Sequence, residues 1–260
     1  MVRFWHLSAE DLSIVEERRR EHNRLGFAVQ LCLLRYPGWP LRPDERPPQN
    51  LVEFVAQQIG ADPAEMETYP AWAETRREHL VLLQKVFRYR PYGSSDSGSL
   101  RAYLQTEALA TDSAFTLVQL AMEWLRERKV ILPALTTLES LVRSVRSLVE
   151  RQVYWRLANG LGEAQKRELT KLLDLGPSKG SVLGWLRRVP RSCSAAGILD
   201  LIRRLIWVRG SGLPPELAET IPPYRLRQLA ARGGRHSVSP FRRFPPEKRY
   251  AILAPRFCST

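Results

Sequence analysis

Hydrophobic residues recur along this chain mostly with the three-to-four-residue spacing of a helix. Alternating apolar and polar positions, which are typical of a half-buried strand, never extend beyond a few residues. The expected helices are residues 16–36, 51–59, 63–69, 75–87, 100–110, 115–129, 138–158, 182–188, 198–208 and 222–231. The sequence therefore predicts an all-α fold of two or three small helical modules with helix-turn-helix-like elements.

Breaks in the helical pattern suggest where these modules begin and end. Residues 93–99 are Gly-Ser-Ser-Asp-Ser-Gly-Ser, a small and polar run that is typical of a linker. A second break lies between Gly176 and Gly180. We therefore expect an N-terminal helical module at residues 1–92, a second module at 99–175 and a third at 181–260.

Residues 52–69 have the spacing of a helix-turn-helix. Ala56 allows a close helix approach, and Gly60 can take the left-handed turn that follows the first helix. The expected core positions are Ile59, Met66 and Tyr69. The second helix carries acidic charges and no basic one, which disfavours contact with phosphates. Both interpretations stay open: a nucleic-acid element, or a helix pair that only packs.

Charge is unevenly divided along the chain. The net charge is +13, and the isoelectric point is near 10.2. Residues 1–130 contain 17 Lys and Arg against 18 Asp and Glu, whereas residues 131–260 contain 23 against 9. A surface of this kind favours nucleic acid as a partner, because each phosphate that it neutralises releases counterions. Membrane binding and plain solubility are the alternatives.

The helix at residues 137–157 has two contrasting faces. We expect one to pack, through Leu138, Leu141, Val145, Leu148, Gln152 and Trp155. The other presents Arg143, Arg146, Ser147, Glu150, Arg151 and Tyr154. Guanidinium groups suit bidentate contacts to phosphate or to a guanine edge, so this face could lie along a groove of DNA. The alternative is a solvated face partly neutralised by an Arg146–Glu150 pair.

Further basic residues lie beside aromatic ones after residue 200, a combination that suits binding to a nucleic-acid backbone with occasional stacking. The complete set of DNA-binding candidates is Arg143, Arg146, Arg151, Arg203, Arg204, Arg225, Arg227, Arg242, Arg243, Lys248 and Arg249.

Motifs for catalysis or metal binding are absent from the sequence. It contains no phosphate-binding Gly-x-x-x-x-Gly-Lys-[Ser/Thr] loop, no His-Glu-x-x-His and no Gly-x-Ser-x-Gly. Cys32, Cys193 and Cys258 are far apart and have no histidine pair beside them that would complete a zinc site. We expect no cofactor, no membrane segment, no small-molecule substrate and a cytoplasmic location.

Several segments resemble the replicative class II transposases, the Tn-three family. The opening segment is Arg-Leu-Gly-Phe-Ala-Val-Gln-Leu-Cys-Leu-Leu-Arg-Tyr-Pro-Gly at residues 24–38. The others lie at residues 52–60, 75–80, 131–134, 137–139, 213–215 and 249–253, so the resemblance covers nearly the whole chain.

The resemblance implies recognition of the terminal inverted repeats of a transposon, as double-stranded DNA, through helical DNA-binding modules. In that family catalysis belongs to a ribonuclease-H-like domain in which Asp, Asp and Glu hold magnesium, and none of the segments above corresponds to it. We therefore expect a non-enzymatic, nucleoid-associated DNA-binding region, truncated before the catalytic domain and with an incomplete third module. The alternatives are a non-functional remnant and a helical scaffold that pairs with intact transposase.

Overall fold

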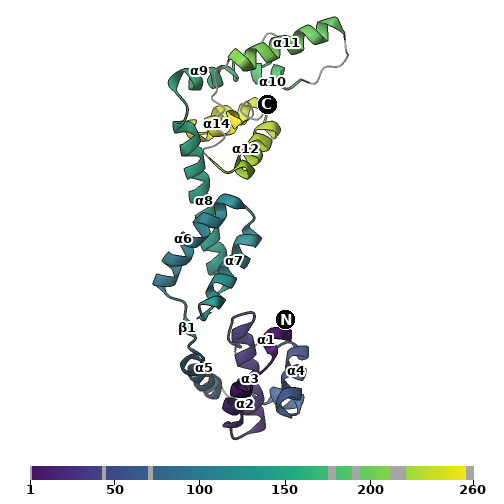
Figure 1. Cartoon of the computed structure of the whole chain (residues 1–260), viewed down its shortest axis with the longest axis vertical. Coiled ribbons are helices and arrows are strands. Elements are labelled where there is room, and N and C mark those ends of the chain that lie inside the picture. Colours follow the sequence, from purple (N-terminus) through teal and green to yellow (C-terminus); the bar gives the residue numbers. More distant parts are fainter. Residues whose placement is uncertain are drawn as a thin grey trace. The chain divides into compact units, whose positions relative to one another are not determined.

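The computed structural model describes residues 2–42, 45–69, 73–174, 180–188, 194–210 and 221–255. The fold is all-α, which confirms the prediction from the sequence (Figure 1). In the described residues the strands are limited to a short parallel pair, β1 (Arg90–Pro91) and β2 (Val130–Ile131).

The chain divides into two compact units, which we describe separately. The first comprises residues 1–104 and 113–142, and the second comprises residues 105–112 and 143–260. Two long helices, α6 (Ser94–Ala110) and α8 (Leu135–Asn159), contribute residues to both. The division into three modules expected at 1–92, 99–175 and 181–260 stays a prediction.

The other helices follow in chain order. The first unit also contains α1 (Val2–Trp5), α2 (Ala9–Glu16), α3 (Glu21–Arg35), α4 (Gln49–Ile59), the 3-10 helix η1 (Pro63–Glu67), α5 (Ala73–Phe87) and α7 (Ala114–Glu127). The second unit also contains α9 (Glu163–Lys171), α10 (Val182–Leu186), α11 (Ala195–Gly210), α12 (Pro223–Arg235), α13 (Val238–Arg243) and α14 (Pro246–Leu253).

Helix α3 is the centre of the first unit. It contacts α1, α2, α4, α5 and η1, and the eight consecutive residues 25–32 are all buried. The helix expected at 16–36 begins later, at Glu21, because the backbone at Arg20 is extended; Glu16 is the last residue of α2. A helix that is enclosed on all sides needs no polar face, which is why these two turns are apolar except for Gln30, whose amide is hydrogen-bonded.

Tyr69 packs directly on the backbone of α3. A Cβ atom placed on Gly26 would lie 2.3 Å from the ring carbons of Tyr69, so only glycine permits this approach. The Gln30 amide donates to the Tyr69 hydroxyl, which in turn lies 2.9 Å from Nδ1 of His79. The lowered pKa of His79, about 4, keeps its imidazole neutral at pH 7, so one ring nitrogen of this buried pair carries a hydrogen and the other does not.

Residues 52–69, which have the spacing of a helix-turn-helix, form the end of α4 and then only the short helix η1. Gly60 has a φ of 64° and ends α4, as its position predicts. Asp62 caps η1 by accepting from the backbone N–H of Ala64. Because η1 is a five-residue 3-10 helix that contacts α3 and α4, its structure matches the packing interpretation of this segment.

The prediction of a linker at residues 93–99 is wrong. Residues 94–99 form the first turns of α6, and the carboxylate of Asp96 accepts from the N–H of Gly93, which precedes the helix. Asp96 also receives two hydrogen bonds of 2.6 Å from the guanidinium of Arg90, which hold its pKa below the usual value. A carboxylate near the amino end of a helix offsets the poor helix propensity of the serines and glycine.

The core of the second unit lies where α14 packs against α9 and α12. Leu169, Leu229, Phe241 and Ile252 are among its buried side chains. Arg187 donates to the backbone carbonyls of Gly233 and His236, at the carboxyl end of α12. That guanidinium satisfies carbonyl groups that have no partner within the helix.

Substitution of Gly26 by alanine should destabilise the first unit, because the added methyl group and the Tyr69 ring cannot occupy the same space. We expect a loss of about 3 kcal/mol in the free energy of unfolding, measured by urea denaturation. Gly98 is the matched control, since a Cβ there meets nothing within 4 Å. Gly98→Ala should leave stability unchanged or raise it by up to about 1 kcal/mol.

The first unit should lose stability as the pH falls from neutrality toward 5. Burial, with the nearby charge of Arg18, lowers the pKa of His79 from 6.5 to about 4. The unfolded chain therefore binds a proton near pH 6.5 that the folded chain does not take up, so stability is complete above that pH and declines below it. Thermal unfolding of wild type and His79→Gln between pH 7 and 5 tests this: the variant should be less stable at pH 7 and show a flatter pH dependence.

Candidate nucleic-acid interface

One stretch of the second unit is rich in arginine and contains no acidic residue in its sequence. Residues 221–243 contain six arginines and no Asp or Glu. In α12 these arginines point two ways: Arg225 is buried and Arg232 half-buried, whereas Arg227 and Arg235 are exposed. The helix therefore has an inner and an outer arginine face.

The inner face binds groups at the end of α6. Arg225 donates to the backbone carbonyls of Ala108 and Thr111. Tyr224 donates a 2.7 Å hydrogen bond to Asp112, which also accepts from Gln228. Burial alone would raise the pKa of Asp112, but these hydrogen bonds and nearby arginines hold it below the usual value.

Arg232 extends this network to α8. It donates to Glu150, whose carboxylate also accepts a 2.7 Å hydrogen bond from the Tyr154 hydroxyl. Burial opposes ionisation of Glu150, yet the hydrogen bonds from Tyr154 and Arg232 lower its pKa. The pKa of the Tyr154 hydroxyl is raised by its burial and by the same carboxylate. Both Asp112 and Glu150 are thus neutralised within the unit.

On α8, Arg143 and Arg151 are exposed, and neither forms an ion pair within the described residues. Arg146 is half-buried, and its charge is one of those that lower the pKa of Asp112. The Arg146–Glu150 pair considered from the sequence does not form, because Arg232 occupies that carboxylate instead.

The expected packing face of α8 is wrong at its carboxyl-terminal end. Gln152 and Trp155 are exposed, with Trp155 at 60%, whereas Tyr154 is 7% exposed and buried. The observed buried stripe continues through Val149 and Val153. A helix advances about 100° per residue, so this stripe drifts around the axis and leaves Trp155 on the outside.

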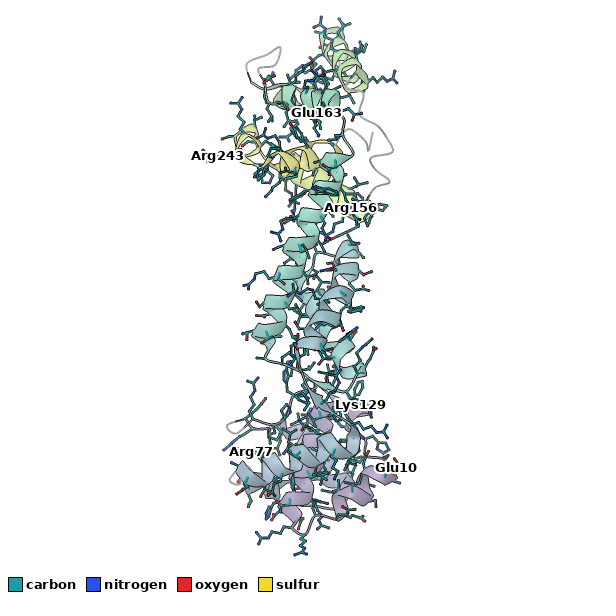
Figure 2. All side chains as sticks on the ribbon, turned by 90° about the vertical axis from the view of Figure 1, so that its left-hand side faces the viewer. Glu10, Arg77, Lys129, Arg156, Glu163 and Arg243 are labelled. Carbon is teal, nitrogen blue, oxygen red and sulfur yellow. The ribbon has the colours of Figure 1, made fainter. Side chains whose placement is uncertain are left out.

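Helices α13 and α14 use some of the candidate cations internally. Arg249 donates to the carbonyls of Phe241, Arg242 and Phe244, and Lys248 lies 4.5 Å from the centre of the Phe244 ring. Arg242 is exposed but donates to the carbonyl of Leu173. Arg243 is exposed, and Figure 2 shows it on a different side of the unit from Arg156.

Helix α11 presents an apolar surface, and its two candidate arginines differ. Arg204 is buried, pairs with Asp200 and donates to the carbonyl of Arg188, whereas Arg203 is exposed. The exposed aliphatic side chains of this helix are Ile198, Leu199, Leu201, Ile202, Leu205 and Ile206. A contiguous apolar face of this kind is typical of a protein–protein contact rather than of a DNA contact.

A groove of about 640 Å³ separates part of α8 from the start of α14. Its lining consists of Ser147, Glu150, Arg151, Gln152, Tyr154, Trp155, Pro245, Glu247 and Lys248. Of the residues predicted to bind DNA, the structure brings Arg151 and Lys248 together here.

Sequence reasoning missed three contributors to this region. Arg235 belongs to the basic stretch noted after residue 200 but was left out of the candidate set, although it is exposed on α12 as Arg227 is. Trp155 was assigned to the core. The internal role of Arg232 has no local signal, because its partner Glu150 is 82 residues away in the chain.

Within the described part of the chain, no group of three or more His, Cys, Asp or Glu side chains is arranged to hold a metal ion. None of the described helices combines the length and apolar character that crossing a bilayer requires.

Comparisons with known proteins identify relatives over nearly the whole chain. Residues 1–145 match the family described as "Domain of unknown function (DUF4158)". The chain is 35% identical to the transposase for transposon Tn1546 of Enterococcus faecium, over 96% of this chain and 26% of that protein. It is 36% identical to the transposase for transposon Tn501 of Pseudomonas aeruginosa, over 98% of this chain and 26% of that protein. The chain thus spans about a quarter of the length of these relatives.

Exchange of Arg225 for methionine should destabilise the second unit, whereas the same exchange at Arg227 should hardly affect its stability. Arg225→Met removes hydrogen bonds to Ala108 and Thr111, and we expect a loss of about 2–3 kcal/mol in the free energy of unfolding. Arg227→Met changes an exposed side chain and should alter stability by less than about 0.5 kcal/mol. Thermal and urea unfolding measure both; equal stability losses would contradict the two-faced description of α12.

Proposed function

Because this chain belongs to the class II (Tn-three) family of transposases, we propose that it binds double-stranded DNA at transposon terminal inverted repeats. The observation that carries the proposal is the separation of arginines in the second unit. Inner arginines neutralise the carboxylates of Asp112 and Glu150. The positive charge of the exposed arginines is therefore not used by these two acids and can attract an external anion.

The proposed contact surface is made of exposed cations from three helices. They are Arg143 and Arg151 of α8, Arg227 and Arg235 of α12, and Arg242 and Arg243 of α13. Phosphate contacts of this kind supply affinity and position the protein on the duplex. Specific recognition of a repeat needs contacts to base edges as well, and arginine is the side chain best suited to a guanine edge.

Arg204, Arg225 and Arg249 have a supporting role in this proposal. Each donates to backbone carbonyls inside its own unit, so they fix the helices that present the exposed cations. We expect their removal to act on DNA binding through folding.

We further propose that these residues bind DNA without cutting or joining it. The relatives are about four times as long as the chain, and the resemblance assigns catalysis to an Asp-Asp-Glu domain outside the matched segments. Magnesium would act in that domain, and the DNA-binding role here requires no cofactor. The site of action is the nucleoid, in the cytoplasm.

A second candidate function is a scaffold that pairs with intact transposase. The exposed aliphatic face of α11 favours it, because such a surface gains free energy when another apolar surface covers it. Co-purification with intact transposase in the absence of DNA, lost in the Leu205→Glu variant, would support this function. A chain that shows no cooperative thermal transition would instead be a non-functional remnant.

Binding to a duplex that carries a terminal inverted repeat should weaken steeply with salt, and fluorescence anisotropy over a range of salt concentrations measures this. Charge reversal of Arg143 and Arg151 should weaken binding and reduce the slope of log K against log salt by about 1–2. The control reverses Arg19 and Arg77, which are exposed arginines of the first unit; Figure 2 labels Arg77. Equal effects of the two double variants would refute the proposed surface, and salt-independent binding would refute the electrostatic mechanism.

A further inference from the structure

The groove between α8 and α14 combines features that ordinary duplex contacts do not need. Trp155 is 60% exposed, and in the described residues its indole forms no ring stack or cation contact. Exposed tryptophan is uncommon, since a large aromatic surface gains free energy when it is covered. The indole face is therefore available to a planar ligand.

Positive charge predominates at this groove. Arg151 comes from α8, on the same element as Trp155, and Lys248 comes from α14 on the facing wall. Glu150 also lines the groove, but its carboxylate is occupied by Arg232 and by the Tyr154 hydroxyl. Glu247 is the remaining acid in the lining, so two cations face one available carboxylate. The ligand that fits has an aromatic plane and negative charge.

We propose that this groove holds an unpaired nucleotide of a DNA strand, with its base against Trp155 and its phosphates near Arg151 and Lys248. The inference rests on the proposed DNA binding and specifies a second mode within it. In a paired duplex the base faces are covered by their neighbours, so only a base that has left the stack can lie on the indole.

The dimensions of the site agree with this ligand. A volume of about 640 Å³ lies within the range of small-molecule sites, roughly 300–1,000 Å³, and accommodates a nucleotide with its flanking phosphates. Arg143 lies eight residues before Arg151 on the same exposed side of α8, about 12 Å along the axis. A strand that follows α8 could therefore contact both guanidinium groups as it enters the groove.

The test compares two labelled duplexes of identical sequence, one fully paired and one with a single extrahelical purine at its centre. Anisotropy titrations at one fixed salt concentration should show tighter binding of the bulged duplex by wild type. Trp155→Ala should weaken binding of the bulged duplex by about 5- to 150-fold and leave the paired duplex unchanged. Trp155→Phe retains an aromatic face and should restore most of the preference.

Two controls separate this mode from general effects. Phe115→Ala removes another exposed aromatic side chain, from the first unit, and should affect neither duplex. A fluorescent purine analogue placed at the bulge should be quenched by wild type and by Trp155→Phe, but not by Trp155→Ala, because stacking on an aromatic ring causes the quenching.

The possible outcomes distinguish failure of the nucleotide site in the groove from failure of the proposed DNA binding. Failure to bind either duplex would overturn DNA binding itself. Equal affinity for the paired and bulged duplexes, or an equal loss on both in Trp155→Ala, would overturn the nucleotide site and leave duplex binding in place.

Discussion

The second unit depends on the ion-pair and hydrogen-bond network that joins the inner face of α12 to the carboxyl end of α6 and to Glu150 of α8. Arg225 and Arg232 bind backbone carbonyls near Asp112 and the carboxylate of Glu150, groups that would be costly to bury without partners. Because these two arginines form hydrogen bonds inside the unit, they fix the rotation of α12 about its own axis. That rotation places Arg227 and Arg235 outside, so internal stability and the external charge pattern have the same origin.

Local chemistry allowed much of the fold to be predicted. Gly60 and Asp62 give the end of α4 and the start of η1 because left-handed turns and amino-terminal caps depend on residues close in sequence. The segment at 93–99 was misread because composition alone suggested a linker. The contact that organises it joins Arg90 to Asp96 only six residues later, but composition alone does not show this pairing.

The charge division of the chain was also visible in the sequence, but the role of each arginine was not. Whether a guanidinium points inward depends on which helix face is buried, and the partners of Arg225 lie 114 and 117 residues earlier in the chain. Trp155 was misplaced for a related reason, since a one-helix pattern cannot show where a drifting apolar stripe ends. Family membership, by contrast, was correctly inferred from short segments.

The aliphatic face of α11 gives the molecule a second kind of surface whose response to ionic conditions is the reverse of the arginine surface. Salting-out ions such as sulfate screen the attraction between arginine and phosphate but strengthen the tendency of exposed Ile and Leu side chains to leave water. If the chain binds DNA as proposed, the salts that weaken that binding also favour burial of the exposed α11 face. The two surfaces therefore place opposite demands on the ionic strength of a buffer: low salt favours the proposed phosphate contacts, and high sulfate favours contacts between aliphatic side chains.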